Sequence, residues 1–215
     1  MNRPWRGAMP VMLTLPLGLE HRPRARQRRW RRWAIGLLVA LGIGLLAAGF
    51  WLPAKAELAQ HLLKRAWNRT TEGDAAAKPW PWADTHPVAR LALPGSGEPL
   101  TVLAGASGRT LAFAPALMDG SASLGSPGVS VIAGHRDTHF RPLAELAIGD
   151  TLALERPDGA VLTYEVTALD VVDSARAQLR LDSDESVVVL VTCWPFDAVA
   201  VGGSWRYVVT ARMRI

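Results

Sequence analysis

An uncharged run of 22 residues, from Trp33 to Ala54, constrains this chain more than any other part of its sequence. A helix rises about 1.5 Å per residue, so a run of this length crosses the roughly 30 Å hydrocarbon core of a bilayer. Trp30, Trp33 and Trp51 lie near its two ends, where amphipathic rings favour the membrane interface. The sequence therefore predicts a single transmembrane anchor over residues 33–54.

The residues before this run are strongly basic. Residues 1–33 hold nine arginines and one acid, Glu20, although the whole chain has a formal net charge of only +5. Such a stretch suits a nucleic-acid-binding arm, but arginines directly before an apolar span instead keep that side in the cytoplasm. We therefore expect a cytoplasmic tail over 1–32, a single-pass protein of the cytoplasmic (inner) membrane with its later residues outside, and no nucleic-acid partner.

A cleavable signal peptide is the alternative interpretation of the apolar run. Ala54, Lys55 and Ala56 resemble a cleavage site with small residues. The run is nevertheless longer than the roughly 7–15 residues of a signal-peptide core. We expect an uncleaved anchor that contacts membrane lipid.

The composition of the segment between the anchor and the later domain changes twice along the chain. Residues 55–67 carry good helix formers with an apolar stripe, which predicts a juxtamembrane helix. Residues 68–87 are first polar and small, then rich in proline and tryptophan, which predicts a linker and an extended arm.

From residue 88 onward, short runs of alternating polarity are separated by turn residues. Such runs, rich in Val, Ile, Thr and Tyr, are typical of strands. The "RPDGA" stretch is a hairpin signal that resembles a type I′ turn. We expect a catalytic or binding domain over 88–215 that is all-β, a closed or nearly closed barrel, with one or two short helices, the located candidate being near 140–146. The expected strands are 88–94, 99–105, 128–134, 150–157, 160–172, 186–193 and 205–215.

Cys193 is the only cysteine in the chain, so it has no partner for an internal disulfide. A lone cysteine is often a small buried hydrophobe. His135 and Arg206, however, also stand where a predicted strand meets a loop. Together the three residue types supply a nucleophile, a group for proton transfer and a donor for an oxyanion. Their spacing along the chain does not show whether they converge.

Metal binding is a rival use of these residues. His135, His139 and Cys193 are all possible zinc ligands. The spacing of the two histidines aligns ligands on a helix, whereas this stretch is predicted as a strand end and loop. No fourth cysteine or histidine lies nearby in the sequence, so we expect neither a metal nor another cofactor.

Three stretches of this sequence closely resemble the sortase family of cysteine transpeptidases. They are "AGHRDTHFRPL", "VVLVTCWPF" and the arginine of "WRYVV", 13 positions after the cysteine. The family signature T-L-x-T-C appears here with Val189 in its first place. The match covers roughly residues 86–215. The segments "AKAELAQHLLKRAW" and "KPWPWADTHPVARL" further resemble the branch found in Gram-negative bacteria, class GN.

The resemblance implies an eight-stranded sortase-type β-barrel and a set of residue roles. Cys193 attacks the Thr–Gly bond of an L-P-x-T-G-like sorting signal and forms a thioester, while His135 protonates the departing amine. Arg206 stabilises the oxyanion or the substrate carbonyls. Thr192 is a candidate substrate contact, and Asp137 either orients His135 or is an exposed loop acid. The implied partners are a surface protein that carries the sorting signal and an amine acceptor.

Two alternatives stay open at this point. The same residues serve a cysteine endopeptidase that uses water as the acceptor. A non-catalytic anchored barrel that binds surface peptides needs Cys193 only as a core residue.

The anchor leads to a prediction about topology. Because the arginines precede the apolar run, a reporter fused after Ile215 is expected to be active only outside the cytoplasm. The mature protein is expected to begin near Met1. An N-terminus at Glu57 would instead establish cleavage after Ala56.

Overall fold

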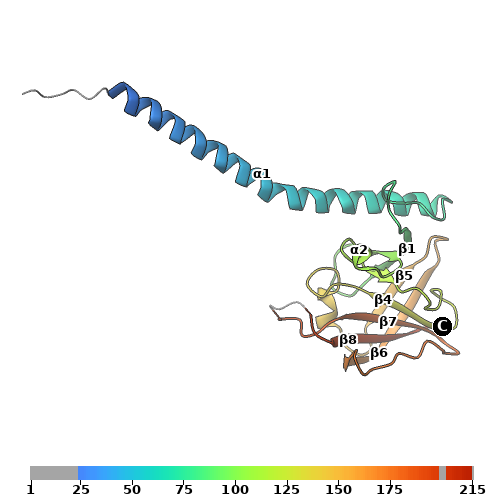
Figure 1. Cartoon of the computed structure of the whole chain (residues 1–215). Helices are drawn as coiled ribbons and strands as arrows, with labels where there is room; N and C mark the ends of the chain where they lie inside the picture. Colours follow the sequence, from blue (N-terminus) through green and yellow to red (C-terminus); the bar gives the residue numbers. More distant parts are fainter. Residues whose placement is uncertain (1–23, 199–201, 215) are drawn as a thin grey trace, which may run out of the picture. The chain divides into compact units, whose positions relative to one another are not determined.

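The computed structural model describes residues 24–198 and 202–214 (Figure 1). The chain divides into two compact units, Met1–Trp51 and Leu52–Ile215. Residues 1–23, which make up most of the predicted cytoplasmic tail, lie outside the described residues.

Helix α1, Arg24–Thr71, contains the predicted anchor. Its part from Arg28 onward is long and apolar enough to cross a membrane, with a mean hydropathy of 2.3 in a window that has no buried residue. Pro53 lies inside the helix and lacks the N–H that would bond to the preceding turn. The residues predicted as a juxtamembrane helix belong to this same element.

The second unit contains a closed barrel of eight strands, so the predicted fold class is confirmed. The strand order around the barrel is β1-β2-β3-β4-β7-β8-β6-β5. The β2–β3 and β4–β7 pairs are parallel, and all the other pairs are antiparallel. The strands are β1 Pro87–Ala92, β2 Leu100–Ala104, β3 Ala116–Leu117, β4 Gly128–Ala133, β5 Thr151–Glu155, β6 Val161–Asp173, β7 Ser186–Cys193 and β8 Trp205–Met213.

Every strand expected from alternation is present, and two short elements were missed. The missed elements are strand β3 and helix α2, Gly108–Leu111, both too short for a periodic pattern to show. The short helix expected near residue 140 is the 3-10 helix η1, Arg141–Glu145.

The turn between β5 and β6 differs from the predicted type. A type I′ turn needs positive φ at both central residues, but Pro157 has a φ fixed near −65° by its ring. Among the described residues only glycines have positive φ, and Gly159 is the one in this turn, at 81°. Gly159 N donates to Arg156 O, and Arg156 N donates to Ala160 O. The turn that closes the hairpin therefore runs from Arg156 to Gly159, with the proline at its second position and the glycine at its fourth.

Alternation along the strands produces two apolar clusters on opposite faces of the sheet. Val188 and Leu190 of β7 point into the barrel, and both are fully buried in its main core with Ile132 of β4. The intervening valines of β7 point to the outer face. There they form a separate cluster, which we call the outer valine cluster; its members are Val129, Val131, Val187 and Val189, with Val191 and Val208 packed against them.

The C-terminal part of α1 packs against the barrel within the second unit. Leu63 is fully buried in a cluster with Leu103 of β2 and with Ala114 and Ala116. Gln60 Nε2 also donates to Phe113 O at 2.9 Å. These contacts make the end of the helix part of the barrel domain.

Candidate active site

Cys193 and Arg206 are direct cross-strand partners at the ends of β7 and β8. Alternation places Cys193 on the face of Val191, and it places Arg206 on the face of Val208. Both side chains therefore lie on the outer face of the barrel, next to the outer valine cluster. Directly opposed residues of an antiparallel pair have Cβ atoms about 4.5–5.5 Å apart, so the thiol and the base of the arginine side chain are neighbours.

His135 reaches the same place from the other side of β7. Strand β4 runs parallel to β7 and ends with Ala133 opposite Val191. The pairing then continues for one residue, because Gly134 N donates to Val191 O at 3.1 Å. His135 follows directly, at the register position beside Cys193. The fold thus brings together the three residues singled out from the sequence.

The three side chains are accessible rather than part of the core. Cys193 and Arg206 are partly buried, and His135 is exposed. Cys193 does not belong to any of the three apolar clusters of buried residues. This placement disfavours the interpretation of Cys193 as a core residue.

The Arg206 guanidinium is held by backbone carbonyls of its own loop. Its Nη1 donates to Gly203 O and to Trp205 O, both at 2.8 Å. Arginine carries further N–H donors on Nε and Nη2. The contacts of Nη1 therefore orient the guanidinium, which keeps its charge and its other N–H donors.

The contacts of Thr192 and Asp137 lie on either side of His135 in the sequence. Thr192 is 3% exposed, and its hydroxyl donates to Gly134 O at 2.7 Å. The Asp137 carboxylate accepts a hydrogen bond from Arg136 Nε at 3.0 Å and is itself exposed. Thr192 thus contacts the backbone of Gly134, which precedes His135, and Asp137 contacts Arg136, which follows it.

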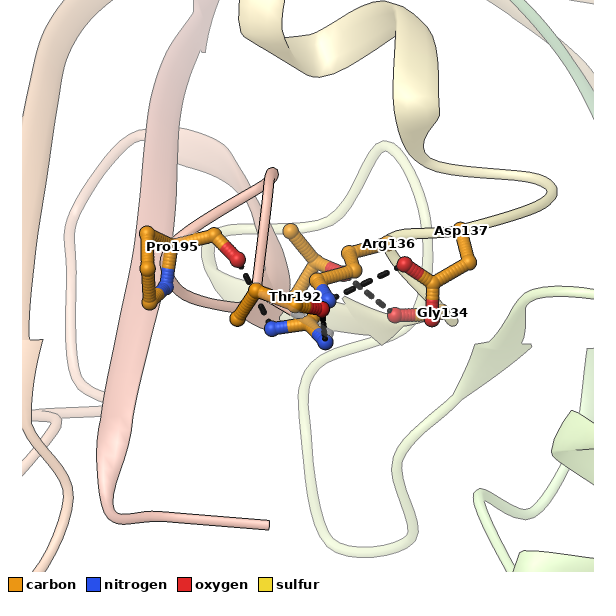
Figure 2. A network of polar contacts seen from close by, with 6 residues as sticks. Gly134, Arg136, Asp137, Thr192 and Pro195 are labelled. Carbon is orange, nitrogen blue, oxygen red and sulfur yellow. Dashed lines mark hydrogen bonds and ion pairs between the residues drawn. The ribbon is translucent and has the colours of Figure 1, made fainter. Parts of the chain in front are cut away.

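Arg136 is a buried charged residue that the sequence analysis did not single out. Its side chain is 5% exposed. Nη1 donates to Pro195 O at 2.7 Å, and Nη2 donates to Ala198 O at 2.8 Å, as part of the polar network in Figure 2. Nothing in the sequence marks this arginine as buried, because its partners are backbone carbonyls about 60 residues away.

The barrel topology and this strand-end arrangement coincide with a family match. A model of the sortase domain matches residues 91–214, which is more than half of the chain. The chain belongs to the sortase family.

Individual sortases match over different shares of their length. Sortase D of Bacillus subtilis (strain 168) is 36% identical over 83 residues, so the match spans 38% of this chain and 41% of that relative. The crystal structure of sortase C-1 from Actinomyces oris is 30% identical with a TM-score of 0.53, over 60% of this chain and 73% of that one. The structure of a Clostridium perfringens Sortase D5 transpeptidase has a TM-score of 0.57 at 20% identity. The match covers 74% of this chain and 99% of that one.

An aromatic cluster includes the residue after Cys193 in this sortase domain. Trp194 follows Cys193 and stacks on Tyr207 with ring centroids 5.7 Å apart, and Phe196 packs edge-on against both rings. Phe196 and Tyr207 also pack against the main core. Burial raises the pKa of Tyr207, so its hydroxyl stays protonated at neutral pH. The aromatic cluster shapes one side of the loop that follows the cysteine.

A second histidine lies close to His135. Burial lowers the pKa of His139, and the nearby His135 lowers it further by charge repulsion. His139 is therefore predominantly neutral at neutral pH. Within residues 24–198 and 202–214, no group of three or more His, Cys, Asp and Glu side chains is arranged to hold a metal ion.

Gly134 gives a testable prediction about this site. A Cβ at Gly134 would lie 2.7 Å from Cδ2 of Phe140, whose ring is fully buried. Because that ring has no room to move, Gly134→Ala is expected to destabilise the protein by about 1–3 kcal/mol, measured by thermal unfolding of the full chain in detergent. Gly97→Ala is the control, since a Cβ there meets nothing within 4 Å. Equal unfolding temperatures for the two variants would contradict the close packing.

Proposed function

We propose that this sortase is a membrane-anchored transpeptidase whose catalytic residues are His135, Cys193 and Arg206. The observation that carries the proposal is the cross-strand pair of Cys193 and Arg206 on one face of the barrel, with His135 at the end of the neighbouring strand. The substrate is an L-P-x-T-G-like sorting signal of a surface protein, and the acceptor is an amine.

In the first half of the reaction, the Cys193 thiol passes its proton to His135, and its sulfur attacks the carbonyl carbon of the Thr–Gly bond. An S–C bond forms, the carbonyl oxygen takes the negative charge, and the C–N bond then breaks. His135 gives a proton to the departing amine, which leaves a thioester on Cys193. In the second half, His135 takes a proton from the incoming amine, a new amide forms, and the sulfur is released.

Arg206 stabilises the charge that develops on the carbonyl oxygen. A guanidinium is cationic and presents its donors in a fixed fork. The contacts of Nη1 with the Gly203 and Trp205 carbonyls support this role, because they orient the group in advance.

Thr192 and Asp137 take supporting roles in this proposal. A buried hydroxyl that donates to Gly134 O suits a residue that holds the His135 backbone, rather than one that contacts substrate. Asp137 pairs with Arg136, which supports an indirect effect on His135 in place of the direct orientation suggested by the sequence.

The anchor and the lineage belong to the same proposal. Helix α1 has an apolar window without buried residues, and arginines precede it in the sequence, which supports a single N-in span of the inner membrane. The juxtamembrane and Trp/Pro segments support membership of the Gram-negative branch. The catalytic domain is then periplasmic.

Hydrolysis is a second candidate outcome of the same chemistry. His135 is exposed, so water has access to the group that would activate it. Product analysis with and without added amine separates the two outcomes: a new amide indicates transpeptidation, and a free carboxylate indicates a cysteine endopeptidase.

The decisive experiment is capture of the acyl-enzyme. The full chain in detergent is incubated with a library of L-P-x-T-G-like peptides and assorted amines, and its mass is measured. Wild type is expected to gain an acyl group on Cys193 that hydroxylamine releases. Cys193→Ala is expected to keep its fold and gain nothing, and Cys193→Ser is expected to be nearly inactive because a hydroxyl is far less acidic than a thiol. Turnover by the alanine variant would refute the assignment.

Arg206 gives a separate prediction about rate. Removal of one oxyanion donor typically costs about 2.7–4 kcal/mol, or roughly a hundred- to a thousand-fold in rate. Arg206→Ala is expected to lower kcat by this amount with a smaller change in KM, since the interaction forms in the transition state. Arg206→Lys keeps the charge but loses the fork, and is expected to recover only a small part of the activity.

Arg212 provides the matched control for Arg206. It lies on the same face of β8, and its Nη1 pairs with Glu185 at 2.7 Å in an exposed ion pair. Arg212→Ala is expected to leave kcat unchanged, because an exposed pair contributes about 0–1 kcal/mol to stability and does not reach the site. An Arg206→Ala variant that works within about threefold of wild type, or that unfolds, would make Arg206 structural.

A further inference from the structure

Arg136 is nearly buried, so its surroundings must supply hydrogen bonds. A guanidinium removed from water is destabilising unless its donors are satisfied. Arg136 makes these contacts with both ends of its fork, and they lead to one segment of the chain: the residues directly after Cys193, represented by Pro195 O and Ala198 O.

The residue on the other side of His135 is tied to the strand that carries Cys193. Gly134 N donates to Val191 O, and Gly134 O accepts from the Thr192 hydroxyl. His135 is therefore flanked by two residues that are both bound to the chain around Cys193, as Figure 2 shows for Gly134 and Arg136. Gly134 binds the residues before the cysteine, and Arg136 binds those after it.

We propose that Arg136 is a positioning residue that fixes the His135 loop relative to the segment that follows Cys193. The inference rests on the proposed function, because it requires His135 and Cys193 to act on one substrate. Two carbonyl acceptors at 2.7 and 2.8 Å from separate nitrogens define both the distance and the orientation of the fork. A lysine ammonium, as a point charge, does not reproduce this planar arrangement.

The contacts of Arg136 favour an effect on the site over one on the whole fold. The β4–β7 and β7–β8 pairings do not include the Arg136 side chain, so the barrel keeps its ladders without it. Its acidic partner Asp137 is 64% exposed and stays hydrated when the arginine is removed. Loss of Arg136 therefore frees the residues 195–198 and the His135 loop from each other.

The first test measures catalysis with the full chain in detergent and an L-P-x-T-G-like peptide. Arg136→Leu is expected to lower kcat by about a hundred-fold, the order of effect that a misplacement of about 1 Å produces, with little change in KM. Arg136→Lys is expected to lower kcat by at least about tenfold. The controls are Arg141→Leu and Arg141→Lys, since Arg141 is exposed and lines a cleft together with Arg136.

The second test needs no substrate and so stands apart from the proposed function. Cys193 is the only native cysteine, so His135→Cys creates a protein with two thiols. Dibromobimane, which bridges neighbouring thiols, is expected to cross-link them readily in this background. Adding Arg136→Lys or Arg136→Leu is expected to slow the cross-linking several-fold, whereas Arg141→Leu is not.

The outcomes separate the two claims. Cross-linking that is slowed only by the Arg136 substitutions supports positioning even where no peptide is turned over, and failure of the Cys193 acylation test then counts against the function alone. Wild-type cross-linking in a folded Arg136→Lys protein overturns the inference. If the leucine variant does not fold, the lysine variant decides.

Discussion

The pairing of β7 with a strand on each side is the interaction on which the site depends. Strand β4 lies parallel to it on one side, and β8 lies antiparallel on the other. The antiparallel partner sets Arg206 directly across from Cys193. The parallel partner, prolonged by Gly134, delivers His135 to the same end. A slip of one residue in either register would turn side chains to the opposite face and separate the group.

The inner face of β7 contributes to the barrel core, and its outer face carries Cys193. Val188 and Leu190 fill the barrel, and Thr192 uses the inward side to hold Gly134 by a buried hydrogen bond. The outward side carries the valines and then Cys193 at the point where the strand ends. Cys193 is partly exposed at this strand end, which suits the nucleophile of the proposed reaction.

Polar contacts of buried side chains fix the loops in place, as strand pairing fixes the strands of the barrel. The Thr192 hydroxyl and the Arg136 guanidinium both reach backbone carbonyls, and so they act on chain segments rather than on other side chains. Backbone acceptors keep their place whatever side chain is present. Such contacts give the segments on both sides of His135 and Cys193 a defined separation, which the proposed transpeptidation requires.

The sequence by itself determined the longer elements and indicated the family. Alternation located the seven longer strands, the uncharged run located the apolar part of α1, and the motifs around His135, Cys193 and Arg206 indicated the family. It did not determine β3 or α2, which are too short to have a period. It located the β5–β6 hairpin but not the form of the Pro157–Gly159 turn, because the proline ring excludes the predicted type I′ geometry. Only the tertiary structure decided that Arg136 is buried, that Thr192 holds Gly134, and that Asp137 pairs with Arg136. The physical reason is that periodicity reports which face a side chain takes within one element. The contacts of Arg136 with Pro195 and of Thr192 with Gly134 instead join segments about 60 residues apart, and their energy exists only when the chain has closed into a barrel.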